Sequence, residues 1–216
     1  MNTSPVRTEP NKRNTLNRLL EVARQEFSTK GLSGARIEEI AREAGVTKQL
    51  VYHYYGSKER LFSAVLDESS HRIMAELIAL EVEHLAPTLA LREILNYCFD
   101  QYMKDPFLGA LALEGIRYHD AHDTPRNMFA DLTPALAEKF DRILQRGAQS
   151  GEFKVVADPR LFLATAALLT SGGFTNHYSM SVLIGVDTRS AQGMQMWRQY
   201  SVDFIVSSIS LTPNPG

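Results

Sequence analysis

Several polar side chains lie close together between Thr47 and His53, and they have the chemistry needed to bind nucleic acid. They supply hydroxyl groups, an ammonium, an amide and an imidazole: Thr47, Lys48, Gln49, Tyr52 and His53. Groups of these kinds hydrogen-bond to base edges in the major groove of DNA and to backbone phosphates. They can act together only if one structural element presents them on the same exposed face.

The sequence on both sides of Gly45 predicts two short helices. Apolar residues recur at helical spacing from Ile37 to Ala44, which is typical of an amphipathic helix. Gly45 can adopt the positive φ that often ends a helix, and Thr47 can cap a second helix. In that second helix three side chains can pack inward: Leu50, Val51 and Tyr54. Two short helices joined by a glycine-containing turn form a helix-turn-helix, whose second helix then exposes the polar side chains.

The same stretch resembles a known family. Residues 40–47 read Ile-Ala-Arg-Glu-Ala-Gly-Val-Thr, and residues 51–61 read Val-Tyr-His-Tyr-Tyr-Gly-Ser-Lys-Glu-Arg-Leu. Both segments resemble the DNA-binding domain of TetR-family regulators, and the resemblance reaches back through Leu19 to cover about 45 residues. It implies a contact between Lys58 and a DNA phosphate. Ser57 supports that role, because a capped helix N-terminus presents backbone N–H groups to phosphates.

Two positions depart from the family pattern. Arg36 stands where the family often has the threonine that begins the second helix, so we expect Ser33 to supply that cap. Tyr54 and Tyr55 replace the usual histidine and phenylalanine. A hydrogen bond expected of that histidine must then be made by a tyrosine hydroxyl.

The composition fits a globular protein with an uneven distribution of charge. Of its 216 residues, 44% are hydrophobic and 22% are charged. Residues 1–60 hold 11 Lys or Arg and 7 Asp or Glu, a charge of +4, whereas residues 61–216 hold 12 and 18, a charge of −6. A basic N-terminal part joined to an acidic body is expected of a protein that turns one end toward DNA.

The location expected from the sequence is the cytoplasm. No apolar run approaches the roughly 20 residues needed to span a bilayer. The first residues, 1–14, lack the apolar core of a secretory signal. The single cysteine, Cys98, excludes an intramolecular disulfide and fits a reducing compartment. Its apolar neighbours argue against a redox sensor.

The periodicity predicts an all-α protein of about nine helices. We expect a flexible arm over residues 1–14, a helix-turn-helix DNA-binding domain over 15–60, and a helical domain for ligand binding and dimerisation over 61–216. The expected helices cover residues 15–30, 37–44, 48–55, 57–85, 88–104, 107–117, 131–149, 160–171 and 191–211. Residues 118–125 and 182–190 are expected to be irregular. Whether the helix from 160 continues through Gly172 and Gly173 to residue 178 stays open.

A homodimer is expected on two grounds. The TetR resemblance implies that the last two long helices pair with those of a second subunit. One short recognition helix also buries little surface, and a two-fold dimer reading two half-sites is the usual solution. Six residues suit that interface or, equally, an internal core: Leu161, Ala164, Leu168, Trp197, Phe204 and Ile205.

Aromatic and polar side chains of the body could line a pocket for a small organic ligand. The candidates are Phe99, Tyr102, Met103, Phe107, Leu111, Glu114, Phe174, His177 and Tyr178. At helical spacing such residues more often belong to a packed core. Glu114 could point into a cavity, or pair with Arg117 one turn later.

Catalytic and metal sites are weakly indicated. His119 and His122 could bind zinc within the segment His-Asp-Ala-His-Asp, although a polar loop of this kind is also simply well solvated. The sequence contains no Ser-His-Asp arrangement, nucleotide-binding glycine loop or HExxH motif. We therefore expect neither an enzyme nor a bound cofactor or metal.

The sequence predicts a cytoplasmic, homodimeric DNA-binding protein that reads a palindromic operator on double-stranded DNA. The TetR resemblance further implies that it is a repressor released by a small-molecule effector. Two alternatives stay open: a helical metal-dependent protein using the His119 segment, and an architectural DNA-binding protein without ligand control. The effector, the operator and the choice between repression and activation stay open.

Overall fold

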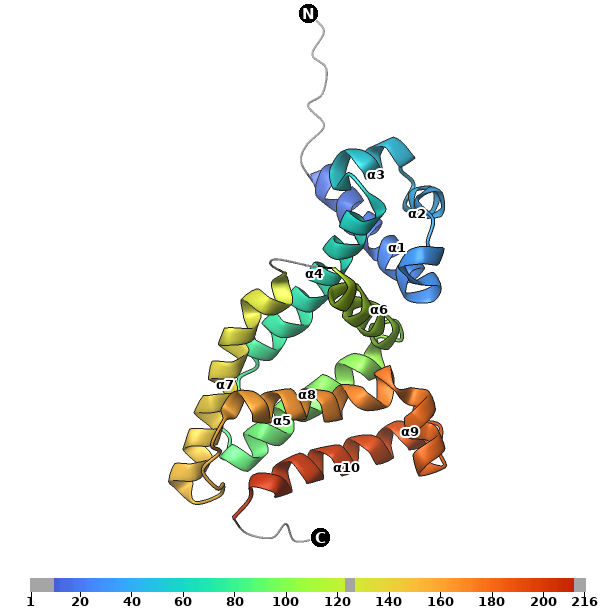
Figure 1. The fold of residues 1–216 in the computed structure, drawn as a ribbon. Helices are drawn as coiled ribbons and strands as arrows, with labels where there is room; N and C mark the ends of the chain where they lie inside the picture. Colours follow the sequence, from blue (N-terminus) through green and yellow to red (C-terminus); the bar gives the residue numbers. More distant parts are fainter. Residues whose placement is uncertain (1–9, 123–126, 212–216) are drawn as a thin grey trace, which may run out of the picture. The chain divides into compact units, whose positions relative to one another are not determined.

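The computed structural model describes residues 10–122 and 127–211, and most of these residues are helical (Figure 1). The described residues form ten helices: α1 (Pro10–Gly34), α2 (Ile37–Ala44), α3 (Lys48–Tyr55), α4 (Lys58–Ala79), α5 (Pro87–Lys104), α6 (Leu108–Ala121), α7 (Met128–Ser150), α8 (Pro159–Thr175), α9 (His177–Ile184) and α10 (Ala191–Ile209). An isolated antiparallel bridge joins Phe153 to Ser210. The predicted all-α class is confirmed.

Several helix ends differ from the predicted ones. α1 begins at Pro10, a residue suited to the first helical position, so residues 10–14 are helical and not part of an arm. The rest of the predicted arm, residues 1–9, lies outside the described residues. The helix expected to reach residue 85 ends at Ala79. α6 continues to Ala121, into the segment expected to be a loop.

α9 is the helix that the sequence pattern missed. It covers part of the segment expected to be irregular, and it ends at Gly185, whose φ of 72° is left-handed. α8, by contrast, runs without interruption through Gly172 and Gly173 to Thr175. A Cβ on Gly173 would lie 2.7 Å from the ring of Trp197, so this glycine makes room for the indole. The indole N–H in turn donates to the carbonyl of Leu169 (2.9 Å).

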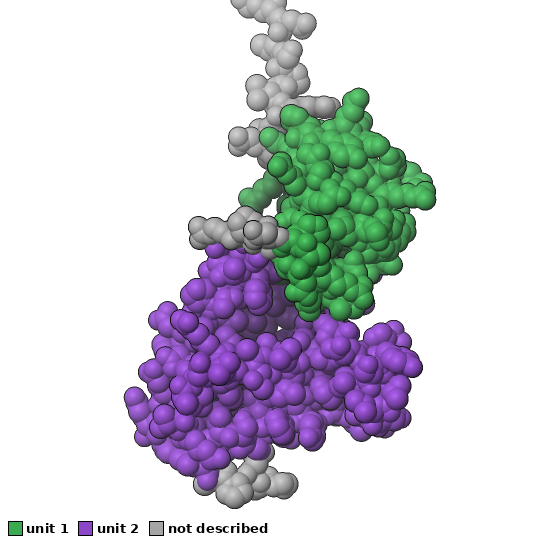
Figure 2. Space-filling view, viewed as in Figure 1, with its two compact units in different colours: residues 1–69, 110–123 green, residues 70–109, 124–216 purple. Residues whose placement is uncertain are grey.

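The chain divides into two compact units (Figure 2). Unit one consists of residues 1–69 and 110–123, and unit two consists of residues 70–109 and 124–216. The domain boundary expected at residues 60 and 61 falls within α4.

In unit one, α1, α2, α3 and the parts of α4 and α6 that belong to it surround a core of buried apolar side chains. The largest are Phe27 and Phe62, whose rings meet edge to face at 5.0 Å. Tyr118 packs against Phe62 on the side of α6 (5.3 Å). The core consists of Leu19, Ala23, Phe27, Ala35, Ile37, Ile40, Ala41, Ala44, Val51, Leu61, Phe62, Val65, Leu66 and Leu111.

The predicted turn between α2 and α3 is confirmed. Gly45 has a φ of 70°, and its N–H donates to the last turn of α2. The hydroxyl of Thr47 accepts a hydrogen bond from the N–H of Leu50 (3.2 Å), so Thr47 caps α3. Local residue preferences thus set the turn and the two helix ends that flank it.

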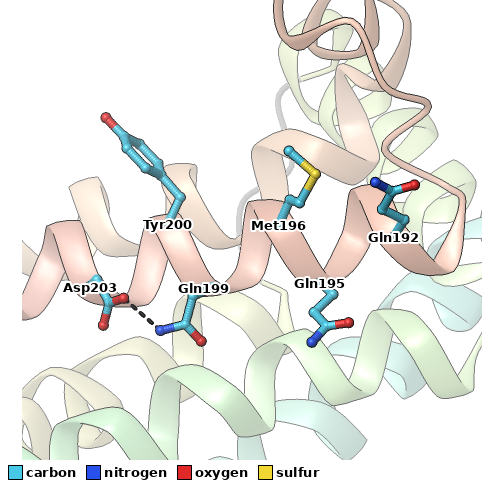
Figure 3. A pocket seen from close by; sticks show the side chains of 6 residues that line it. All are labelled: Gln192, Gln195, Met196, Gln199, Tyr200 and Asp203. Atoms are coloured by element: carbon cyan, nitrogen blue, oxygen red, sulfur yellow. Dashed lines mark hydrogen bonds between the residues drawn. The ribbon is translucent and has the colours of Figure 1, made fainter. Parts of the chain in front are cut away.

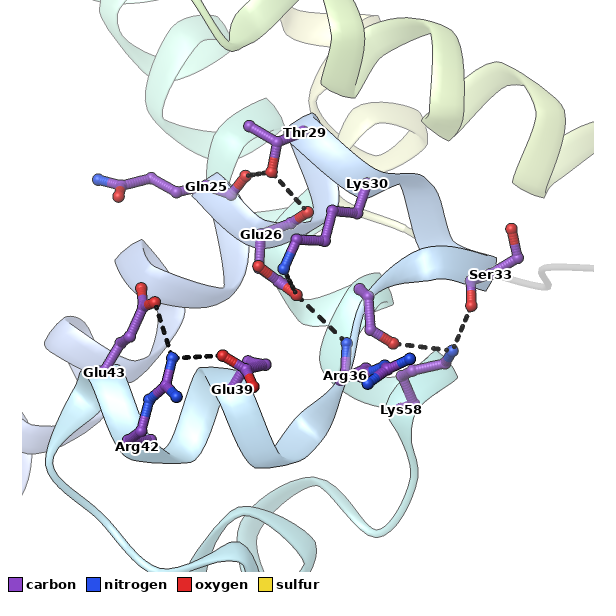
Figure 4. A network of polar contacts seen from close by, with 11 residues as sticks. Gln25, Glu26, Thr29, Lys30, Ser33, Arg36, Glu39, Arg42, Glu43 and Lys58 are labelled. Atoms are coloured by element: carbon purple, nitrogen blue, oxygen red, sulfur yellow. Dashed lines mark hydrogen bonds and ion pairs between the residues drawn. The ribbon is translucent and has the colours of Figure 1, made fainter.

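The prediction that Ser33 caps α2 is wrong. The residue at the cap position is Arg36, and its side chain makes no capping bond. The first turn of α2 instead carries Glu38 and Glu39, whose charges favour a helix N-terminus. The N–H of Arg36 donates to the carboxylate of Glu26 (3.4 Å; Figure 4), so α1 supplies the nearby acceptor.

A contact within unit one explains the bend near the end of α1. Gly31 has a φ of 68°, outside the helical region. The carboxylate of Glu114, from α6, accepts a hydrogen bond from the N–H of Leu32 (3.1 Å) and an ion pair from Arg117 (2.9 Å). A Cβ on Gly31 would lie 3.0 Å from the same carboxylate, so only glycine fits here without a shift.

In unit two, α5, α7, α8 and α10 enclose a larger apolar core. Arg198 connects α10 to α5, because its guanidinium donates to Asn96 (2.8 Å) and Asp100 (2.7 Å) of α5. The core consists of Leu77, Val82, Ala90, Leu91, Ile94, Leu95, Phe99, Phe140, Ile143, Leu144, Phe153, Ala166, Val202, Ile205, Val206 and Ile209.

A buried lysine ends α4. The ammonium of Lys139, on α7, donates to the backbone carbonyls of Ile78 (2.8 Å) and Leu80. The side chain is 2% exposed, and burial lowers the pKa of its ammonium. Carbonyls at the end of a helix need such donors, so this contact accounts for the end of α4 at Ala79.

Replacing Lys139 with methionine should destabilise the fold. Lys139→Met keeps an unbranched side chain but removes the donor to two buried carbonyls, and we expect the free energy of unfolding to fall by about 1–3 kcal/mol. Urea denaturation followed by circular dichroism measures this change. The control is Glu83→Gln, which alters the exposed carboxylate 4.0 Å from the same ammonium. Equal stability of the Lys139→Met and wild-type proteins would contradict the assignment.

Alanine at Gly31 should also be costly. Gly31→Ala places a Cβ at positive φ and against the Glu114 carboxylate, so we expect a loss of about 1–3 kcal/mol in thermal or urea unfolding. Gly34→Ala is the matched control, because Gly34 is helical and a Cβ there would make an ordinary 3.4 Å contact with Lys30. Similar losses for both substitutions would show that neither φ nor Glu114 matters.

Candidate DNA-binding surface and effector site

α3 presents the predicted DNA-reading side chains on the surface of unit one. Val51 is buried, and Leu50 and Tyr54 are half-buried, so this side of the helix packs inward as expected. The exposed residues are Thr47, Lys48, Gln49, Tyr52 and His53. The fold therefore brings five of the six predicted DNA-binding residues together around one short helix, and the sixth, Lys58, lies on α4.

Tyr54 packs through its ring. The edge of His53 meets that ring at 5.3 Å, and the ammonium of Lys12 lies 5.5 Å from its centre. Among the described residues the Tyr54 hydroxyl has no hydrogen-bond partner. The hydrogen bond that we expected a tyrosine to make in place of the family's histidine is therefore not made by Tyr54 within this part of the chain.

Lys48 is held by neighbours on two helices. Its ammonium forms an ion pair with Glu38 of α2 and lies 5.6 Å from the centre of the Tyr52 ring. The hydrogen bond with Lys48 lowers the pKa of Glu38, and the same bond raises the pKa of Lys48. Both groups therefore keep their charges at neutral pH.

Lys58 occupies a different environment from the one its motif suggests. Ser57 caps α4 as predicted, since its hydroxyl accepts from the N–H of Arg60 (3.2 Å). The ammonium of Lys58, however, donates to the carbonyls of Ser33 (3.3 Å) and Ala35 (3.2 Å; Figure 4). Lys58 thus ties α4 to the junction of α1 and α2, and its phosphate contact stays a prediction.

The predicted effector residues do not form one group. In unit two, the ring of Phe174 stacks on Tyr102 (4.4 Å between ring centres) and lies 6.1 Å from Phe99. Burial raises the pKa of Tyr102 to about 12, which keeps its hydroxyl protonated. Cys98 lies on the same helix, and burial raises its pKa to about 12, so it carries no reactive thiolate.

The other candidates have separate environments. Phe107 and His177 are half-buried, whereas Met103 and Tyr178 are exposed on unit two. Leu111 belongs to the core of unit one, and Glu114 binds the backbone of α1. Among the candidates, the ring of Phe174 contacts those of Tyr102 and Phe99, and the ligand site stays a prediction.

The two predicted metal ligands contact an aromatic ring. His122 stacks on Tyr118 (4.5 Å), and its Nδ1 lies 2.9 Å from the Tyr118 carbonyl oxygen. His119 meets the same ring edge to face (5.6 Å). Over residues 10–122 and 127–211, no three His, Cys, Asp or Glu side chains are grouped to hold a metal. Asp123, from the same sequence motif, lies outside the described residues.

The predicted interface residues divide into exposed and buried groups. Leu161, Ala164 and Leu168 are exposed on α8, and Phe204 is exposed on α10. Trp197 is half-buried, and Ile205 belongs to the core of unit two.

A groove on α10 (Figure 3), which the sequence analysis did not predict, lies near the exposed Phe204. It is lined by Gln192, Gln195, Met196, Gln199, Tyr200 and Asp203. These residues recur three or four positions apart in the sequence, and that helical spacing could have predicted that they share one face of a helix.

None of the described helices is long and apolar enough to cross a membrane.

Two family models match the chain over most of its length. The model for bacterial regulatory proteins of the tetR family matches residues 19–65. The model for the tetracyclin repressor-like C-terminal domain matches residues 87–205. The first range includes all of α2 and α3, and the second extends from α5 into α10.

Curated relatives and solved structures agree with these matches. The HTH-type transcriptional repressor NicS of Pseudomonas putida is 25% identical over 199 residues, covering 90% of this chain and 92% of NicS. The HTH-type transcriptional regulator RutR of Escherichia coli is 39% identical over 78 residues, 36% of each chain. The crystal structure of the transcriptional regulator FadR from Bacillus subtilis, in complex with stearoyl-CoA, has a TM-score of 0.67 and 18% identity, covering 90% of this chain and 99% of that chain.

The family models match both the helix-turn-helix and the helical body, and the N-terminal match includes the helix that presents the polar side chains. The chain therefore belongs to the tetR family of bacterial regulatory proteins and is a DNA-binding transcriptional regulator rather than an enzyme.

Proposed function

We propose that this regulator is a homodimeric repressor, acting in the cytoplasm, that binds a palindromic operator and is released by a small organic effector. The observation that carries the proposal is the exposed polar face of α3 in unit one, in a chain whose α8 and α10 carry outward apolar side chains. The names of related proteins support repression, since NicS is a transcriptional repressor.

Operator reading is assigned to the exposed face of α3. Lys48 and Gln49 lie at its N-terminal end, the part of a recognition helix that usually contacts bases. A glutamine amide can bond both the N6 and the N7 of adenine, and a lysine ammonium can bond the O6 and N7 of guanine. Tyr52 lies one turn later and can reach a phosphate through its hydroxyl.

Dimerisation is assigned to the outward faces of α8 and α10. Leu161 and Leu168 on α8 are 68% and 72% exposed, and Tyr200 and Phe204 on α10 are 64% and 51% exposed. Large apolar side chains that gather on one surface usually mark an interface. A second copy of the chain is the natural partner, because two recognition helices are needed to read a palindrome.

The groove on α10 supplies polar groups for the same interface. Gln199 donates to Asp203 (2.6 Å; Figure 3), and Asp203 also pairs with Arg92 (2.7 Å). Glutamines and a tyrosine beside apolar side chains match the mixed character of protein interfaces.

Effector binding is assigned to the surroundings of Phe99, Tyr102 and Phe174 in unit two. Stacked rings with one hydroxyl suit an apolar or aromatic molecule. A protein of the same fold, FadR from Bacillus subtilis, is in complex with stearoyl-CoA, which supports an organic effector here. To release DNA, the effector must bind the DNA-free conformation more tightly, by about 1.4 kcal/mol for each tenfold loss of DNA affinity.

Selection of bound duplexes from a random pool tests the proposal. Enrichment of a palindrome with half-sites about one helical turn apart or more supports a dimeric operator reader. The enriched duplex then permits a screen of small molecules for release of DNA and for a rise in melting temperature. Enrichment without any releasing molecule would favour an architectural protein without ligand control. Sequence-blind binding, before and after refolding to remove any bound effector, would contradict the proposal.

Gln49→Ala should relax the selected sequence at one base pair in each half-site. Loss of a two-pronged contact with a base should cost about 1–3 kcal/mol of discrimination at that position and leave the others unchanged. Repeating the selection with the variant measures this. Gln145→Ala is the control, because Gln145 is an exposed glutamine on α7. An unchanged preference at every position would remove Gln49 from the readout.

Phe204→Asp should weaken the dimer. A carboxylate in an apolar interface is costly, and we expect the dimer dissociation constant to rise at least about tenfold, or 1.4 kcal/mol. Sedimentation velocity over a concentration series measures the change. Val155→Asp provides the control, since Val155 is 86% exposed but lies outside α8 and α10. A Phe204→Asp protein as dimeric as the control would exclude this face as the interface.

A further inference from the structure

Glu38 is an acidic residue beside the proposed DNA-reading face of α3. It belongs to the first turn of α2, and its carboxylate pairs with Lys48, the first residue of α3. Both side chains are well exposed, at 60% and 49%. An exposed ion pair of this kind adds little to the stability of a fold. We therefore expect the Glu38–Lys48 pair to affect DNA binding more than the stability of the fold.

The pair leaves Lys48 able to bond a base. A lysine ammonium has three donors, and Glu38 uses one of them while the Tyr52 ring lies 5.6 Å away. The free donors can still reach an acceptor on a base edge. Because Lys48 has a long flexible stem, holding its ammonium in advance reduces the ordering cost of that contact.

The same pair opposes contact between Lys48 and a phosphate. To reach a phosphate away from Glu38, Lys48 must break the ion pair. A phosphate that approaches the pair instead meets the negative charge of Glu38. Phosphate contacts supply most of the affinity for non-specific DNA, whereas base contacts distinguish sequences. The Glu38 carboxylate should therefore weaken the complex with non-specific DNA more than the complex with the operator.

We propose that Glu38 is a positioning residue that determines specificity, by directing Lys48 toward base edges and away from phosphates. The hydrogen bond between the two side chains lowers the pKa of Glu38 and raises the pKa of Lys48. The inference rests on DNA binding and requires neither a dimer nor an effector.

Glu38→Gln should lower the specificity of binding. We expect the ratio of affinities for the selected operator and for a mixed-sequence duplex to fall about threefold to tenfold. On the mixed-sequence duplex, Lys48 gains a phosphate contact, so the slope of log K against log salt should steepen by about 0.9. Fluorescence anisotropy titrations at several salt concentrations measure both effects.

Glu138→Gln is the matched control. It removes the same charge and breaks an exposed ion pair with Arg142 (2.9 Å), but it lies on α7 in unit two. This control should leave the specificity ratio and the salt slope unchanged. If Glu38→Gln raises both affinities by one factor, as a general charge effect would, the proposal is overturned.

A double-mutant cycle with Lys48→Ala shows whether Glu38 acts through Lys48. In the Lys48→Ala protein, adding Glu38→Gln should change neither the specificity ratio nor the salt slope. An equal effect in both backgrounds would overturn the proposal. Thermal melts of all variants check that unit one stays folded. The salt slope on the mixed-sequence duplex needs no operator, so it tests the role of Glu38 even where the selection fails, and an unchanged slope would overturn the proposal.

Discussion

The proposed DNA-reading surface depends on the burial of one side of α3 against the core around Phe27 and Phe62. Their rings meet at 5.0 Å in a core that also takes Val51 from α3 and the apolar face of α2. Because α3 is short, it cannot be stable in water by itself. Packing of Val51 therefore keeps the helix formed and sets its rotation, which leaves the polar side chains exposed.

Cations bonded to backbone carbonyls are a recurring device in both units. Lys58 binds the carbonyls of Ser33 and Ala35 near the end of α1, and Lys139 binds those of Ile78 and Leu80 at the end of α4. Arg146 of α7 donates to the carbonyl of Leu85, which lies in the segment between α4 and α5. The last carbonyls of a helix have no partner within it and carry partial negative charge, so a cation satisfies both demands. Basic residues in this protein thus serve the fold as well as DNA.

Acidic residues of unit one also have two kinds of partner: backbone N–H groups and a basic side chain. Glu114 binds the backbone next to Gly31, and Glu26 accepts the N–H of Arg36 before α2. Both carboxylates fix how the chain enters the helix-turn-helix. Glu38 differs, because it pairs with a side chain of the reading surface itself. A helix-turn-helix therefore depends on carboxylates to place its elements, even though its ligand is a polyanion.

The sequence by itself determined the elements that depend on near neighbours. Helical spacing from Ile37 to Ala44, the left-handed Gly45 and the Thr47 cap predict the helix-turn-helix and its exposed polar set, because each signal acts within one or two turns. Only the tertiary structure decided the contacts between distant residues. Lys58 meets a carbonyl 25 residues away, and Glu114 meets an N–H 82 residues away. A flexible charged side chain can satisfy many partners equally well, so its partner is chosen by the packing that brings two segments together.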